Sequence, residues 1–159
     1  MAKTALQFLH NGREIAVFVD GGMNLLAALR DLVGDMTPKF GCGQGGCGAC
    51  TVLIDGAAHL SCLTLAETVE GRSVETLDSL KDGPKLHPLQ TAFMEHFAAQ
   101  CGYCTPGMLM AAKALLDRNP TPTRAEVVEA ISGNICRCTG YEPIINAVLA
   151  AASGGRARA

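Results

Sequence analysis

The sequence predicts an α+β protein in which strands and helices occupy different parts of the chain. Short β-rich runs and one helical segment fill residues 1–77, and four helical segments without a convincing strand fill residues 88–152. The polar stretch 78–87 is expected to be a linker between them. Strands followed by a run of helices are typical of an α+β fold or of two small domains. We expect the remaining tail, 153–159, to be disordered.

Turn signals and hydrophobic periodicity define the elements of the first part. Asn11-Gly12 joins the first two strands, and this pair is the strongest short hairpin signal because both residues tolerate a positive φ. Apolar residues then recur at helical spacing until Gly34 ends the run. Asp55-Gly56 marks a turn behind the next strand, and a weaker strand follows. The predicted strands are 4–9, 14–19, 51–54 and 69–76, and the predicted helix is 25–33.

Capping signals and apolar spacing place the four helices of the second part. Leu89, Phe93 and Phe97 recur every four residues and form the expected apolar face of the first helix. Thr105 is the expected N-cap of the second helix, with Pro106 at its first helical position. A Thr-x-x-Glu capping box opens the third. The predicted helices are 89–99, 106–118, 123–133 and one that begins at 142.

Composition and charge narrow the function classes. The formal net charge is −2, so no basic field is present to attract nucleic acid. The longest apolar runs are far shorter than the roughly 20 residues that span a bilayer. No signal peptide is visible, which predicts a cytoplasmic protein. Because a reducing cytosol keeps thiols free, the eight cysteines are expected to be metal ligands rather than disulfide partners.

The eight cysteines fall into two sets of four. The loop set is Cys42, Cys47, Cys50 and Cys62, and the bundle set is Cys101, Cys104, Cys136 and Cys138. The loop set has the Cys-x4-Cys-x2-Cys spacing, with a fourth cysteine downstream, of plant-type [2Fe–2S] sites. Interleaved glycines would let amide N–H groups approach the sulfurs. A structural zinc loop is the alternative, although zinc sites usually combine two short cysteine pairs.

The bundle set is ambiguous by spacing alone. Cys-x2-Cys followed by Cys-x-Cys suits a tetrahedral zinc ion, a second cluster or, in its first pair, a redox dithiol. Its two segments occupy the turns between helices one and two and between helices three and four. In an up-and-down bundle both turns lie at the same end, so the four thiols could converge. Helix N-termini follow Cys104 and Cys138 and would favour an anionic centre there.

Three long motifs surround the cysteines. They are GCGQGGCGACTV at 41–52, QCGYCTPGM at 100–108 and GNICRCTGY at 133–141. In this order they resemble the small iron–sulfur subunit of the molybdenum hydroxylases, the xanthine oxidase family, and the resemblance covers residues 3–152. It implies a ferredoxin-like β-grasp domain followed by a four-helix bundle, with a [2Fe–2S] cluster on each cysteine set.

The same resemblance implies partner subunits and an electron path. A large molybdenum–pterin subunit and a medium FAD subunit would form a heterotrimer with this chain, and the heterotrimer would dimerise. The molybdopterin is expected in its cytosine dinucleotide form. Electrons would pass from molybdenum through the bundle set, then the loop set, to FAD. In the family, the residues that match Gln100 and Cys138 also contact the pterin.

The family leaves the substrate open. Hydroxylation of an N-heterocycle or an aldehyde and reduction of an aryl-thioester are all expected possibilities. Carbon monoxide is not favoured, because the family's carbon monoxide dehydrogenases carry Asp-Thr-Ser-His where this chain has GQGG at 43–46. No Ser/His/Asp arrangement, paired acid or phosphate loop stands out, so we expect no substrate chemistry on this chain. The rival functions are a free-standing two-cluster electron carrier and a zinc-stabilised interaction module.

The residues beside the cysteines and the remaining methionines and histidines indicate no single role. Arg137 could donate to a cluster sulfur or a cofactor phosphate, or brace its loop. Tyr103 and Tyr141 could shield a cluster from water or pack at helix ends. Met108 and Met110 are expected in the core. The four histidines share no spacing with one another and are expected to be structural or at the surface.

Overall fold

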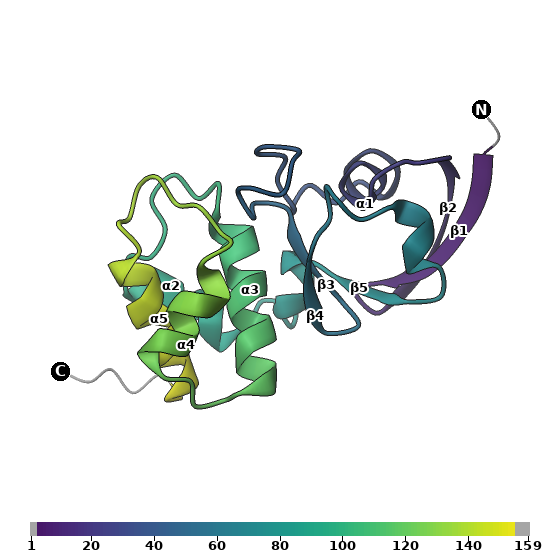
Figure 1. Cartoon of the computed structure of the whole chain (residues 1–159). Coiled ribbons are helices and arrows are strands. Elements are labelled where there is room, and N and C mark those ends of the chain that lie inside the picture. The colour runs from purple at the N-terminus through teal and green to yellow at the C-terminus, as the bar shows by residue number, and fades with distance from the viewer. Residues whose placement is uncertain (1–2, 155–159) are drawn as a thin grey trace.

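The computed structural model describes residues 3–154 and has the predicted α+β class (Figure 1). A sheet with short helices forms one half of the molecule, and four longer helices form the other. Ser153 and Gly154 lie in a turn after the last helix, where the Ser153 amide donates to Leu149 O at 3.1 Å. The rest of the tail predicted to be disordered, 155–159, lies outside the described residues.

The sheet has five strands. They are β1 (Lys3–His10), β2 (Arg13–Asp20), β3 (Thr51–Ile54), β4 (Ala57–Leu60) and β5 (Ser73–Glu75). Their order is β2-β1-β5-β3-β4, in which β1 and β5 are parallel and the other neighbours are antiparallel. Asn11 and Gly12 have φ of 50° and 78°, as the hairpin prediction requires. Asp55 and Gly56, at 48° and 79°, turn β3 into β4, a strand that the sequence did not predict.

The predicted helix over 25–33 forms, but in two geometries. After the N-cap Asn24, α1 (Leu25–Ala27) continues directly as the π-helix η1 (Ala28–Val33). Gly34 ends the segment at φ 83°, as predicted. Its apolar face packs on the sheet, where Leu25 and Leu29 are fully buried.

The segment that joins the halves is more structured than predicted. The 3₁₀-helix η2 (Ala66–Val69) and a turn at Gly71 shorten the strand predicted over 69–76 to the three residues of β5. The 3₁₀-helix η3 (Leu77–Leu80) enters the stretch predicted as a linker and buries Leu80 among the helices. The domain boundaries 1–77, 78–87 and 88–152 stay a prediction.

Four helices share one apolar core. They are α2 (Pro88–Glu95), α3 (Thr105–Arg118), α4 (Arg124–Ile131) and α5 (Glu142–Ala152). Met108 and Ile144 lie at its centre, fully buried. Thr123 and Glu126 form the predicted capping box of α4. Thr105 is the first residue of α3 rather than its N-cap, which is Cys104 in helical conformation.

The first predicted helix ends four residues early. Leu89 and Phe93 are buried as predicted, but Phe97 is 81% exposed and has φ 53°. A positive φ cannot continue a right-handed helix, so α2 stops at Glu95 and the predicted apolar face is wrong at Phe97. His87 caps the start of α2 in a capping box.

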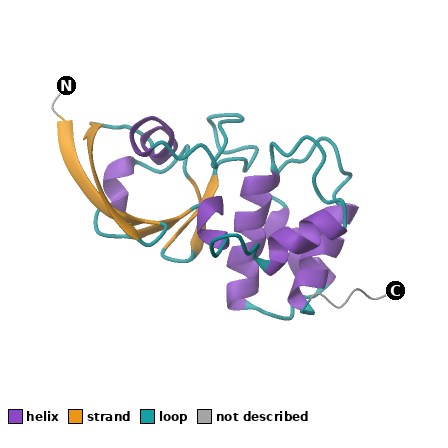
Figure 2. Cartoon of the chain, turned by 180° about the vertical axis from the view of Figure 1, so that it is seen from behind, coloured by secondary structure: helices purple, strands orange, loops and turns teal. Residues whose placement is uncertain are grey.

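Strand β3 and helix α3 join the two halves. Leu53 of β3 is fully buried in the same core as the helices. From behind, the sheet and the helices stand side by side, and long loops emerge at one end of both (Figure 2). None of the helices within residues 3–154 is long and apolar enough to cross a membrane.

Candidate metal centres

The loop set lies in the glycine-rich segment between η1 and β3 and just beyond β4. Because β3 and β4 are antiparallel, Cys50 before the hairpin and Cys62 after it lie side by side. Ser61 reinforces this closure: its amide and hydroxyl donate to Cys50 O at 3.3 and 2.7 Å. The thiols of each of two pairs are near enough to affect ionisation: Cys62 acts on the pKa of Cys50, and Cys47 acts on that of Cys42.

Backbone amides stabilise the thiolate of Cys42. The N–H of Gln44 first, then the Cys47 thiol and the N–H groups of Gly46 and Cys47, lower the pKa of Cys42 to about 7. Cys50 has the opposite environment, because burial raises the pKa of its thiol to about 11. Metal ligation requires deprotonated thiols. Cys42 can therefore bind a metal as a thiolate near neutral pH, whereas Cys50 needs a bound cation in order to ionise.

Gly41 leaves room for the Cys47 sulfur. A Cβ at position 41 would lie 2.7 Å from Cys47 Sγ, closer than real Cβ atoms approach a neighbour. Any side chain there would displace the sulfur. The close packing that the interleaved glycines predict is therefore present at this position.

The bundle set comes from two loops at the same end of the helices, as the up-and-down arrangement predicts (Figure 1). Cys101 and Cys104 lie between α2 and α3, and Cys136 and Cys138 lie between α4 and α5. Cys101 Sγ is 3.6 Å from Cys138 Sγ, and the Cys136 thiol is near enough to Cys104 to raise its pKa. Cys101 and Cys138 are exposed, whereas Cys136 is buried. One pair therefore faces outward and the other inward.

Burial opposes ionisation of both thiols of the inner pair, but it determines the direction of the pKa shift only at Cys104. It raises the pKa of Cys104 to about 12, and the neighbouring Cys136 thiol adds to the rise. Burial also opposes ionisation of Cys136, but the hydroxyl of Thr139 at 3.1 Å and the amides of Cys138 and Thr139 outweigh it and lower the pKa. Tyr141 braces this loop, because its hydroxyl oxygen accepts the Cys136 amide at 2.9 Å.

Within each set the thiols lie as two neighbouring pairs. Within residues 3–154, no three His, Cys, Asp or Glu side chains come close enough together to hold one metal ion. A [2Fe–2S] cluster places two thiolates on each of its two irons, which matches two pairs per set. A structural zinc ion needs four ligands around one point. The donor sets fit two-iron clusters better than zinc.

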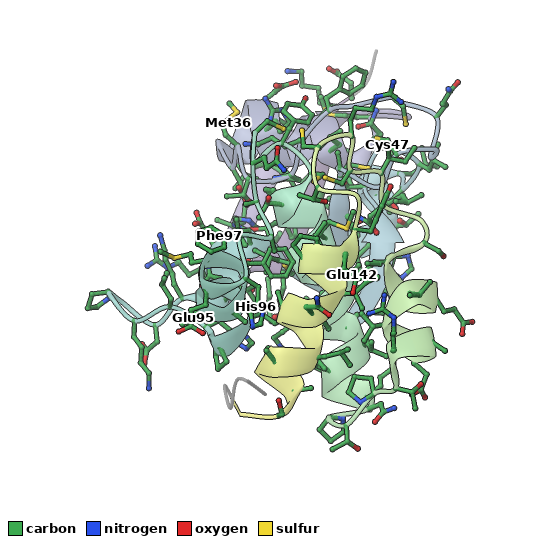
Figure 3. The ribbon with its side chains drawn as sticks, turned by 90° about the vertical axis from the view of Figure 1, so that its left-hand side faces the viewer. Met36, Cys47, Glu95, His96, Phe97 and Glu142 are labelled. Carbon is green, nitrogen blue, oxygen red and sulfur yellow. The ribbon has the colours of Figure 1, made fainter. Side chains whose placement is uncertain are left out.

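Hydrogen bonds connect the loops of the two sets. The Ile135 amide donates to Cys47 O at 2.9 Å, and the Tyr103 hydroxyl donates to Phe40 O at 2.6 Å. Figure 3 places Cys47 at the loop end of the molecule, above the helices. The sequence offered no signal for these contacts, since the partners lie far apart along the chain. Tyr103 thus links the two loops instead of packing at a helix end.

The structure also locates Gln100, Arg137 and the two methionines that the sequence indicated. The Gln100 side-chain amide donates to Cys138 O at 3.2 Å, which holds Gln100 beside the exposed thiol pair. Arg137 is exposed between its two cysteines. Met108 and Met110 are buried at 0% and 1%, which confirms their place in the core.

The histidines have structural or surface positions. His10 Nε2 lies 2.9 Å from Asp35 Oδ2, and His87 caps α2. His59 on β4 and His96 after α2 are half-buried. This agrees with the prediction from their spacing.

Two known families match the chain. The 2Fe-2S iron-sulfur cluster binding domain matches residues 8–76, which contain the loop set. The [2Fe-2S] binding domain matches residues 68–149, which contain the bundle set. The chain therefore carries two [2Fe–2S]-binding domains.

Three similar proteins align with most of the length of this chain. The nicotine 6-hydroxylase small subunit of Paenarthrobacter nicotinovorans is 55% identical over 139 residues, which cover 87% of this chain and 84% of that protein. The xanthine dehydrogenase iron-sulfur-binding subunit of Escherichia coli O157:H7 is 44% identical over 141 residues, with 87% and 88% covered. The structure of quinoline 2-oxidoreductase from Pseudomonas putida 86 matches with a TM-score of 0.93 and 49% identity, over 97% of this chain and 96% of that chain. This chain belongs to the molybdenum hydroxylase (xanthine oxidase) family and is one of its small [2Fe–2S] subunits.

Proposed function

We propose that this chain relays electrons within a molybdenum hydroxylase through two [2Fe–2S] clusters, one on each cysteine set. The observation that carries the proposal is the arrangement of the thiols, two neighbouring pairs in each set. The loop set would supply the four ligands of one cluster and the bundle set those of the other. The clusters supply one-electron redox chemistry when bound.

The exposure of one thiol pair of the bundle set supports a direction for electron transfer through the chain. Cys101 and Cys138 are exposed beside Gln100, and we assign this edge to the pterin of a large molybdenum subunit. Gln100 and Cys138 would contact that pterin and fix its position. The inner pair, Cys104 and Cys136, lies on the side that is hydrogen-bonded to the loop set. The loop set would then deliver electrons to FAD on a medium subunit.

The whole enzyme would be a cytoplasmic dimer of heterotrimers that holds its molybdopterin as the cytosine dinucleotide. Two of the similar proteins are named for nicotine and quinoline, both N-heterocycles, which favours an N-heterocycle as the substrate to be hydroxylated. Aldehyde hydroxylation and aryl-thioester reduction are the alternatives. The substrate would bind on the large subunit, so residues of this chain would not select it.

Metal analysis and EPR of the purified chain test the cluster assignment. We expect about four irons per chain, no stoichiometric zinc, and two distinct [2Fe–2S] signals after reduction with dithionite. One iron pair per chain, or one zinc ion in place of iron, would reject the proposal.

A free-standing carrier is the alternative function for a chain with both clusters. Purification of the chain from its native source separates the two functions. The proposed subunit elutes with a molybdenum-containing partner in fixed stoichiometry. A carrier elutes alone with both EPR signals intact.

A further inference from the structure

One backbone oxygen lies where the two cysteine loops meet. Gly48 O accepts the Thr51 amide at 3.1 Å, the Thr51 hydroxyl at 2.7 Å and the side-chain amide of Asn134 at 2.9 Å. Asn134 is only 4% exposed. A buried amide keeps its hydrogen-bond partners because leaving them unpaired is costly. Asn134 therefore ties the second loop of the bundle set to the loop set.

Glycines allow the backbones to touch at this point. A Cβ on Gly107 of α3 would lie 2.2 Å from Gly48 O, and a Cβ on Gly48 would lie 2.5 Å from Gly133 O. Gly48 also has φ +67°, a conformation that suits glycine. A larger residue at Gly48 or Gly107 would have to push the loops apart. The spacing between the two cysteine sets is therefore fixed by direct backbone contact.

The residue after Asn134 completes a bonded route between the sets. The Ile135 amide donates to Cys47 O at 2.9 Å, while its side chain is 55% exposed. From Cys47 Sγ the route follows covalent bonds to Cys47 O and crosses this single hydrogen bond. It then continues along the backbone through Ile135 to Cys136 and its sulfur. Electron tunnelling through bonds is faster than across gaps of the same length.

We propose that Asn134 is a positioning residue for electron transfer between the two cysteine sets. Its hydrogen bond to Gly48 O keeps the two loops close enough for the Ile135 amide to donate to Cys47 O. The inference rests on the proposed function. In the step, one electron would pass from a cluster held by the bundle set to a cluster held by the loop set, with no proton moved and no bond broken. The Asn134 amide donates to Gly48 O and Thr51 Oγ1 rather than to a sulfur, so its loss should leave both potentials unchanged.

Asn134→Ala and Gly107→Ala test the inference in the full chain with both clusters bound. Asn134→Ala removes the tie, and Gly107→Ala pushes α3 against Gly48 O from outside both loops. Gly133→Ala is the matched control, because a Cβ there meets nothing within 4 Å. The measurements are iron content, the two midpoint potentials, the magnetic splitting between the two reduced EPR signals, and the rate of transfer between clusters after flash reduction.

We expect both test variants to keep both signals and both potentials, to show a weaker splitting and to transfer electrons several-fold more slowly than Gly133→Ala. An unchanged splitting and rate would overturn the inference. So would the loss of a cluster from Asn134→Ala, since Asn134 would then serve cluster binding. If the unmodified chain itself lacks two [2Fe–2S] signals, the proposed function fails. Two signals with unaffected variants reject only the role of Asn134.

Discussion

The loop set and the bundle set each present two neighbouring thiol pairs, but the chain assembles them in different ways. Three loop-set cysteines lie in one short loop, 42–50, and a β-hairpin brings the fourth. The bundle set joins two loops separated by α3 and α4, so its geometry depends on how the helices pack. The first site is built mainly by local sequence and the second by tertiary structure.

Two thiols, Cys42 and Cys104, show what this difference does to ionisation. A local loop can aim its own amides at a sulfur, and Gln44 N–H does so at Cys42, whose pKa falls to about 7. Helix packing instead buries the thiol of Cys104, whose pKa rises to about 12. The comparison teaches that backbone amides prepare Cys42 for a cation, whereas Cys104, like Cys50 of the loop set, depends on the cation to balance its buried thiolate.

Removal of one thiol from each set gives the largest expected effect. Cys47→Ala should eliminate one of the two EPR signals of the reduced chain and Cys104→Ala the other, because three thiolates cannot complete a cluster. Iron content should fall by about half in each variant. A variant that loses both signals would contradict the separation into two sites.

A core substitution among the helices should affect the bundle set selectively. Leu89 is fully buried in α2, and Leu89→Ala should lower the free energy of unfolding by about 2–5 kcal/mol. We expect the bundle-set EPR signal to disappear at a lower urea concentration than the loop-set signal. Leu29→Ala, fully buried on the sheet side, is the matched control and should reverse that order. If both EPR signals disappeared at the same urea concentration in each variant, the two sets would not depend on different parts of the core.

Thiol reactivity of the cluster-free chain should rank Cys42 of the loop set above Cys104 of the bundle set. Near pH 7 about half of Cys42 is thiolate, whereas Cys104 is almost wholly protonated. Brief iodoacetamide treatment followed by mass spectrometry should therefore modify Cys42 well before Cys104. The chain with both clusters bound is the control, in which both thiols should be protected. Equal modification of the two in the cluster-free chain would contradict the assigned environments.

The smallest expected effect concerns Asp35, a buried carboxylate just after η1. Burial acts to raise the pKa of Asp35, but hydrogen bonds from His10, Thr76 and Thr37 outweigh it and hold the pKa well below its usual range. The ionised carboxylate therefore stabilises the fold above the unfolded pKa of about 3.9, and this contribution is lost as the pH falls further. Urea unfolding across the acid range should show this decline in the wild-type chain. Asp35→Asn should be less stable at neutral pH and lose less stability on acidification, and an equally steep decline would contradict the account.

The sequence predicted those features that depend on neighbouring residues. The Asn11-Gly12 turn and the Thr123 capping box each act within a few residues, and each has the predicted local structure. Phe97 shows the limit, because apolar spacing continued beyond the residue at which the backbone leaves the helix. Periodicity reports which side chains are apolar, and it cannot report a change in φ.

No pattern in the single sequence predicted the contacts between distant segments. Asn134 is 86 residues from Gly48, and nothing near either residue indicates that a buried amide joins them. The contact between Tyr103 and Phe40 O is similar. The convergence of the bundle set could be predicted only because an up-and-down bundle places alternate turns at one end.

Substrate-driven reduction of the assembled enzyme tests the series arrangement of the two sets most directly. The enzyme is mixed with an N-heterocycle that the wild type oxidises, and EPR and flavin absorbance are followed together. In Cys47→Ala the bundle-set signal should appear while FAD stays oxidised. In Cys104→Ala neither the loop-set signal nor reduced FAD should appear. Reduction of FAD in either variant at the wild-type rate would contradict the account, because electrons would then reach the flavin without passing through both sets.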